Sequence, residues 1–173
     1  MLSRQLILAL FAELNAELEA VNIRGDVFII GGAAMAVAYD ARPSTRDIDA
    51  IWEPSVEVRE AAKRVARNHD DLPDDWLNDG AKAFMPRKDR GEQRVVFEGK
   101  FLTVRAASPA YLLATKILAS RVSRDEDDIL LLYSLCGFTS VDEGVRLVEK
   151  FYPGVPIEAK ARFLLEELLT PPS

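Results

Sequence analysis

Cysteine and histidine are nearly absent from this sequence. Among 173 residues there is one cysteine, Cys136, and one histidine, His69. A single cysteine forms no disulfide within the chain, which is typical of proteins in a reducing cytoplasm. A zinc site is disfavoured because the chain has no cluster of Cys or His, and a Ser-His-Asp relay is disfavoured because the one histidine lies in a polar loop. We therefore interpret Cys136 as a packing residue and His69 as a solvated loop residue.

Long hydrophobic runs are missing as well. No stretch approaches the roughly 20 apolar residues of a membrane-spanning helix. Residues 1–21 place apolar side chains at helical spacing, but Glu13, Glu17 and Glu19 interrupt them. This pattern indicates an amphipathic helix and not a signal peptide. We expect a cytoplasmic protein without a membrane partner.

The sequence also lacks an excess of positive charge. Lys and Arg number 22 against 28 Asp and Glu, which gives a net charge of −6. This balance weighs against broad, non-specific nucleic-acid binding but leaves room for a local basic patch. One candidate is the outer face of the helix expected at residues 53–69, which is either ordinary solvated surface or a seat for an RNA acceptor. Its cations are Arg59, Lys63, Arg64 and Arg67.

The hydrophobic pattern predicts an α/β fold in two parts. Residues 1–105 read as a small mixed β-sheet core with flanking helices, and residues 106–173 read as a C-terminal helical bundle. Helices are expected at 3–21, 33–39, 53–69, 108–121, 124–137, 140–152 and 156–169, with a further short helix within 70–86. Strands are expected at 27–30, 47–52, 94–99 and 101–106.

Two aspartates interrupt one of the apolar strands. In DIDAIW, Asp47 and Asp49 are two residues apart and should share one face, while Ile48 and Ile51 are expected to face apolar surroundings. Adjacent carboxylates repel unless a cation lies between them. Their oxygen-only ligand set suits Mg²⁺, with Mn²⁺ as an alternative, and such ions take substrate phosphates as further ligands.

A glycine pair precedes these aspartates. Gly31 and Gly32 follow an apolar strand and precede a short helix. Glycine lets backbone N–H groups approach an anion closely, and a helix N-terminus favours negative charge. Together with the aspartates, this order of elements suggests a site for a nucleoside triphosphate and a metal ion.

The stretch IIGGAAMAVAYDARPSTRDIDAIW, residues 29–52, resembles the signature of the DNA polymerase β-type nucleotidyltransferase superfamily. Three further pieces, DDWLNDGAKAF, SPAYLLATKILASR and RDEDDILLL, resemble the small prokaryotic nucleotidyltransferases of the DUF6036 group. That group is similar to the AbiE-like and MenAT-like toxin nucleotidyltransferases. The resemblance extends from about Val27 to Leu169.

The resemblance implies roles for individual residues. Asp47 and Asp49 would hold two metal ions, and Gly31 and Gly32 would hold the triphosphate. The remaining residues implied in substrate binding or catalysis are Thr45, Arg46, Lys116, Arg121, Arg124, Asp125 and Asp128.

One departure from the superfamily pattern concerns a third carboxylate. The strand FLTVRA, on which the superfamily places it, has no acidic residue. By resemblance, Asp125 or Asp128 would substitute for it from a helix, with an arginine one turn away. Acidic residues at the start of a helix are also explained by the helix dipole alone. Lys116 either lies at the rim of a cleft or extends to solvent. Trp76 is interpreted as a packing residue, with stacking on a base as the alternative.

Three functions follow from these residues. The leading one is transfer of a nucleoside monophosphate from a nucleoside triphosphate to an acceptor. By resemblance, the acceptor is the 3′ end of a tRNA and the protein is a toxin neutralised by an antitoxin protein. A small-molecule acceptor, as in antibiotic nucleotidyltransferases, suits the acidic charge slightly better. A binding protein that keeps the fold without turnover would explain the missing carboxylate.

Overall fold

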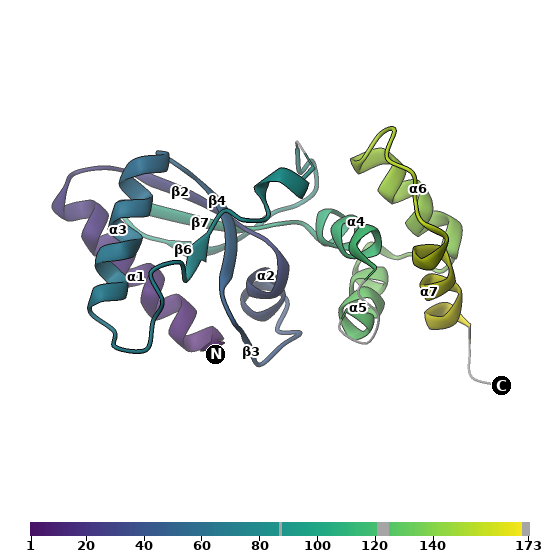
Figure 1. The fold of residues 1–173 in the computed structure, drawn as a ribbon, viewed down its shortest axis with the longest axis horizontal. Coiled ribbons are helices and arrows are strands. Elements are labelled where there is room, and N and C mark those ends of the chain that lie inside the picture. The colour runs from purple at the N-terminus through teal and green to yellow at the C-terminus, as the bar shows by residue number, and fades with distance from the viewer. Residues whose placement is uncertain (87, 121–124, 171–173) are drawn as a thin grey trace. The chain divides into compact units, whose positions relative to one another are not determined.

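The computed structural model describes residues 1–86, 88–120 and 125–170 and divides into two compact units. The sheet unit combines Met1–Phe84 with Gln93–Ala107, and the helical unit combines Met85–Glu92 with Ser108–Ser173. The segment 85–92 therefore belongs with the C-terminal helices although the sheet unit surrounds it in sequence. The expected α/β class, a small mixed sheet with helices and further C-terminal helices, is confirmed (Figure 1).

The sheet unit contains a five-stranded sheet in the order β5-β4-β2-β7-β6. Strand β2 pairs antiparallel with β4 and parallel with β7, so the sheet is mixed. Its strands are β2 (Gly25–Ile29), β4 (Ile48–Glu53), β5 (Leu77–Asn78), β6 (Arg94–Glu98) and β7 (Leu102–Ala106). Its helices are α1 (Arg4–Ala20), α2 (Gly31–Ala38), α3 (Ser55–Arg67) and the 3₁₀ helix η1 (Lys82–Phe84).

The core of this unit lies between one face of the sheet and the helices α1 and α3, and α2 adds the buried residues 33–37. Figure 1 shows α1 and α3 side by side, and they pack on each other and on the sheet. Helix α1 contributes apolar residues three or four positions apart, the spacing of one helical face. Its buried residues are Ile7, Leu10, Phe11, Leu14 and Leu18.

The opposite face of the sheet is more exposed. Strand β4 alternates, with Ile48, Ala50 and Trp52 buried and Asp49 and Ile51 half-buried. Ile51 therefore lies on the same face as Asp49, and the expectation that it shares the apolar surroundings of Ile48 is wrong. The reason is the two-residue period of a strand, which puts residues three apart on opposite faces.

The first residues of the chain hold the loop between α2 and β4. Strand β1 (Leu2–Ser3) pairs antiparallel with β3 (Ser44–Thr45). The Ser3 side chain also accepts a hydrogen bond from the Leu6 N–H and so caps α1, as expected from the sequence. The two short strands were not expected, because a two-residue pairing has no periodic pattern to detect.

The helical unit consists of four helices among its described residues. They are α4 (Pro109–Ala119), α5 (Glu126–Cys136), α6 (Val141–Phe151) and α7 (Ala159–Leu169). Ser108 caps α4 with Pro109 at the first helical position, and Gly137 ends α5 in the left-handed conformation. These capping residues explain why the helix limits agree with the expected ones. Across the described ranges, no helix is both long and apolar enough to cross a membrane.

Candidate functional site

The glycine pair forms the turn from β2 into α2. Gly31 has a φ angle of 58°, which favours glycine, and a Cβ added to it would lie 3.2 Å from Asp49 Oδ2. A Cβ added to Gly32 would lie 2.7 Å from Thr45 Oγ1. Ile30, the N-cap residue, makes no side-chain capping bond to the helix. The turn thus presents an N-terminus without a side-chain cap, with glycine where space is tightest.

The carboxylate of Asp49 lies beside this turn. Asp49 is the second residue of β4, and its backbone carbonyl accepts a hydrogen bond from the Ile30 N–H at 3.0 Å. Asp47 precedes the strand and is half-buried, and its carbonyl accepts a hydrogen bond from Thr45 Oγ1 at 3.1 Å. The structure therefore brings the Gly31–Gly32 turn, Thr45 and both aspartates together.

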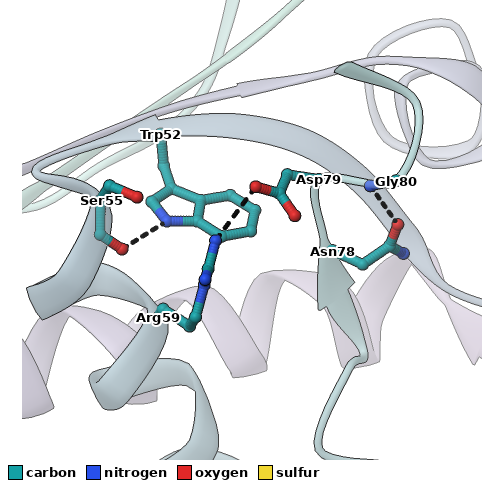
Figure 2. Close-up of polar contacts among 6 residues, drawn as sticks. All are labelled: Trp52, Ser55, Arg59, Asn78, Asp79 and Gly80. Carbon is teal, nitrogen blue, oxygen red and sulfur yellow. Dashed lines mark hydrogen bonds and ion pairs between the residues drawn. The ribbon is translucent and has the colours of Figure 1, made fainter. Parts of the chain in front are cut away.

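A neighbouring residue that the sequence reasoning missed is Asn78. It is the register partner of Asp49 in the parallel pairing of β4 with β5, and paired residues face the same side of a sheet. Its Oδ1 accepts a hydrogen bond from the Gly80 N–H at 3.1 Å, which orders the turn after β5 (Figure 2). The only signal for Asn78 was its position in DDWLNDG, because a two-residue strand has no pattern of its own.

The aspartates fit a divalent cation that completes its shell with substrate. Within the described residues, no group of three or more His, Cys, Asp or Glu side chains is placed to hold a metal ion. Mg²⁺ is usually bound through one or two carboxylates and completed by waters and substrate phosphates. The two carboxylates of Asp47 and Asp49 match this mode of binding. They are too few to enclose a metal ion with protein ligands alone.

A second cluster of expected site residues lies in the helical unit. Lys116 Nζ lies 2.8 Å from Asp125 Oδ1 and 2.7 Å from Asp128 Oδ2. The three residues are 7%, 5% and 3% exposed, respectively. Lys116 is in the last turn of α4, and the two acids are at the start of α5, so the cluster joins these helices. Lys116 does not extend into solvent, because both carboxylates hold its ammonium group inside the unit.

Comparison with protein families decides the classification. The model of the family described as nucleotidyltransferase of unknown function (DUF6036) matches residues 5–143. The chain belongs to this nucleotidyltransferase family. No curated protein and no solved structure matches the chain.

The DUF6036 match covers the glycine turn, both aspartates and the Lys116 cluster. Arg46, expected beside the phosphates, is exposed in the loop before β4. Arg121 and Arg124 lie outside the described residues. The structure thus gathers the other expected residues into two groups, one in each unit of this DUF6036 protein.

Base stacking by Trp76 is excluded by burial. The Trp76 side chain is 0% exposed, and its Nε1 donates to the Ala62 carbonyl at 3.0 Å. Both faces of the ring are therefore inside the sheet unit. His69 also differs from expectation, because its Nε2 lies 2.9 Å from Glu13 Oε2 in a partly buried pair. The sequence could not show this contact, since 56 positions separate the two residues.

The outer face of α3 is poorly suited to bind RNA. Arg59 pairs with Asp79 at 3.0 Å and lies over the Trp52 ring, as Figure 2 shows. Lys63 pairs with Glu60 at 2.9 Å, and Arg64 pairs with Glu17 at 2.6 Å. Carboxylates thus neutralise most of this face, which favours its interpretation as ordinary helix surface.

Proposed function

We propose that this DUF6036 protein is an active nucleotidyltransferase, with the Gly31–Gly32 turn and the Asp47–Asp49 pair as its nucleotide site. One observation carries the proposal. The glycine turn lies directly beside Asp49, so close that a Cβ on Gly31 would come within 3.2 Å of the carboxylate. An anion-binding backbone and a cation-binding carboxylate are the two halves of a site for a metal-bound triphosphate.

The reaction is a phosphoryl substitution. An acceptor hydroxyl oxygen forms a bond to the α-phosphorus, the bond from that phosphorus to the bridging oxygen of the β-phosphate breaks, and pyrophosphate leaves with the electron pair. The hydroxyl proton passes to a base. In this scheme the N–H groups at the start of α2 hold the triphosphate, and Thr45 supports the loop through its hydrogen bond to the Asp47 carbonyl.

Asp47 and Asp49 would hold Mg²⁺, or Mn²⁺ in its place, as one or two ions. Such ions stabilise the charge that develops on the phosphate oxygens and the leaving pyrophosphate. The carboxylates' own part is to orient the bound cation toward the phosphates. The half-buried position of both aspartates lowers competition from bulk water.

The base is assigned by resemblance alone. Strand β7 lacks a carboxylate, and the likeness to the toxin group assigns the proton acceptor to Asp125 or Asp128. In that assignment Lys116, with both acids at its ammonium group, positions them. Separate Asp125→Asn and Asp128→Asn variants test the assignment, because loss of the base lowers the rate while nucleotide binding persists.

The acceptor and the biological role also rest on resemblance. We propose the 3′ end of a tRNA as acceptor, and we propose that the protein is the toxin of a pair with a cognate antitoxin protein. A small-molecule acceptor is the second candidate, and the net charge of −6 favours it because it opposes tRNA binding.

The test is nucleotidyl transfer by the purified protein. The protein is incubated with Mg²⁺, each α-labelled nucleoside triphosphate in turn, and total tRNA. Asp47→Asn and Asp49→Asn should each lower labelling by at least about 100-fold, because a weakened hold on the cation removes electrostatic stabilisation of the charge that develops on the reacting phosphate. Asp71→Asn, an exposed loop aspartate, is the matched control and should label like the unchanged protein.

The possible outcomes separate the candidates. Label on RNA that depends on both aspartates supports transfer to tRNA and names the preferred nucleotide. Label on a small antibiotic supplied in place of tRNA, but not on RNA, moves the assignment to the second candidate. Absence of label with either acceptor, while the protein is folded and Mn²⁺ is also supplied, would show a binding protein without turnover.

A further inference from the structure

A cavity of about 690 Å³ opens in the helical unit, apart from the residues assigned above. Residues 85, 86, 88, 90 and 91 form one wall, and the end of α6 with the loop that follows forms the other. This volume lies in the range of cavities that hold a small organic ligand. The lining side chains that carry charge or an aromatic ring are Lys88, Arg90, Lys150, Phe151 and Tyr152.

Hydrogen bonds fix the first wall against α4. Asp89 accepts from the Ser108 hydroxyl at 2.6 Å, from the Ser108 N–H at 2.7 Å and from the Gly91 N–H at 3.0 Å. The Tyr111 hydroxyl donates to the Pro86 carbonyl at 3.1 Å. The cavity is therefore built into the unit, and binding there would not require ordering a free loop.

The charge of the cavity is positive in an acidic protein. Lys88, Arg90 and Lys150 are exposed at its rim, and within the described ranges none of them forms an ion pair. Asp89 adds one negative charge, but both of its oxygens accept hydrogen bonds from Ser108 or Gly91. The α3 cations, in contrast, are mostly paired. The rim thus offers cations to a ligand that brings its own negative charge.

Aromatic surface lies beside these cations. Phe151 and Tyr152 are half-buried, and the Phe151 ring packs edge-on against Tyr111 with centroids 5.7 Å apart. Aromatic rings next to cations are the combination that binds single-stranded nucleic acids, because bases stack on rings while phosphates contact Lys and Arg.

We infer that this cavity binds a nucleotide unit of a single-stranded nucleic acid, the acceptor strand of the proposed transfer. The role of this strand as acceptor rests on the proposed function, but the binding of the strand does not. A phosphorylated nucleoside is the shared chemistry, and it has two sources, a strand and a free nucleotide. The rim favours a strand, because three separate cations suit phosphates spaced along a backbone.

The experiment measures fluorescence anisotropy of a labelled single-stranded RNA of about 12 nucleotides with the full-length protein. EDTA and the absence of nucleoside triphosphate prevent transfer, so the result does not depend on catalysis. The test variant is Lys88→Gln with Arg90→Gln. The control is Lys160→Gln with Arg162→Gln, which removes the same charge at the same spacing on α7, outside the cavity lining. Arg162 differs from the rim cations in that it pairs with Asp142 at 3.1 Å.

The test variant should bind RNA about tenfold or more weakly, and its plot of log affinity against log salt should be shallower by about 1.4, as expected for two lost phosphate contacts on a single strand. The control should bind within about twofold of the unchanged protein. Tyr152→Leu should weaken binding about fivefold or more with the salt slope unchanged, because stacking releases no counterions.

RNA affinity equal in the test and control variants would overturn the inference. Loss of ATP binding in the test variant with unchanged RNA binding would overturn the strand assignment in favour of a free nucleotide. Comparison with the transfer assay separates the two proposals. RNA binding without nucleotidyl transfer would contradict only the proposed function. Nucleotidyl transfer, together with unchanged RNA binding in the test variant, would contradict only the proposed role of the cavity.

Discussion

At the scale of single residues, glycine shapes the cluster around Asp49, and buried charge shapes the cluster around Lys116. Gly31 adopts a φ of 58° beside Asp49, and Gly32 has no room for a Cβ next to Thr45. Lys116 is charged and 7% exposed, which is tolerated because two carboxylates surround its ammonium group. Removing one partner of such a buried group leaves an unpaired charge, which costs more than the pair itself contributes.

Lys116→Met should therefore destabilise the protein by about 3 to 5 kcal/mol, because the buried carboxylates of Asp125 and Asp128 would lose the ammonium group that lies between them. The free energy of unfolding is measured with urea. Lys160→Met, at an exposed position of α7, is the control and should stay within about 0.5 kcal/mol of the unchanged protein.

A triple variant that adds Asp125→Asn and Asp128→Asn should recover part of the lost stability, since the repelling charges are then removed. Equal instability of the single and triple variants would show that Lys116 acts through packing of its stem and not through charge.

At the scale of elements, helix contacts in the helical unit depend on one small residue. Gly144 is buried in α6, and a Cβ on it would collide with the Tyr133 hydroxyl from α5. The same Cβ would lie 3.2 Å from Ile117 Cδ1 of α4. Three helices thus meet at a position where only glycine fits.

Gly144→Ala should lower the free energy of unfolding by about 1 to 3 kcal/mol, the usual cost of overpacking. The sign is informative, because the same change inside an uncrowded helix raises stability by about 0.5 to 1 kcal/mol. Urea unfolding followed by circular dichroism measures the difference.

Combining Gly144→Ala with Tyr133→Phe should restore part of the stability, since the hydroxyl is the nearest obstacle. The rescue should be incomplete, because the ring carbon Cζ would still lie 2.9 Å from the new Cβ. A stabilising Gly144→Ala would contradict the packing described here.

At the scale of the whole molecule, the charge distribution and three tyrosines of raised pKa determine how the protein depends on pH and salt. The net charge is −6, yet the unpaired cations of the cavity lie together in the helical unit. The same unit contains Tyr111, Tyr133 and Tyr152. Burial raises the pKa of Tyr133 to about 12 and that of Tyr152 to about 12, and it raises the pKa of Tyr111 as well.

Stability should fall as the pH rises from about 10 toward 12. A tyrosine in the unfolded chain loses its proton near pH 10, so above that value the unfolded state binds fewer protons than the folded state. The contribution is fully present below pH 10 and disappears as the pH passes through the folded pKa. The urea midpoint at pH ~9 and pH ~11 measures it.

The Tyr133→Phe, Tyr152→Phe double variant should show a smaller loss between these two pH values than the unchanged protein. A loss of the same size in both would assign the alkaline transition to other groups. Comparison at pH ~7 corrects for any packing effect of the substitutions, because both tyrosines are then neutral in either state.

The elements could be predicted because their signals are local. Ser3 and Ser108 cap helices within one turn of themselves, Gly137 ends a helix, and alternation marks β4. The glycine turn and the D-x-D strand were also readable, since a few consecutive residues carry the chemistry. The family resemblance, read from the same stretches, is confirmed by the DUF6036 match.

The fold class, the capped helices and the order of glycine turn and aspartates follow from the sequence, because each depends on neighbours in the chain. Which groups meet follows from the folding of the chain in three dimensions. It paired the α3 cations with distant acids, buried Trp76, enclosed Lys116 between Asp125 and Asp128, and placed Pro86 and Asp89 against the start of α4. The physical reason is that a contact between residues far apart in sequence depends on how helices and strands pack, and no local pattern encodes that packing.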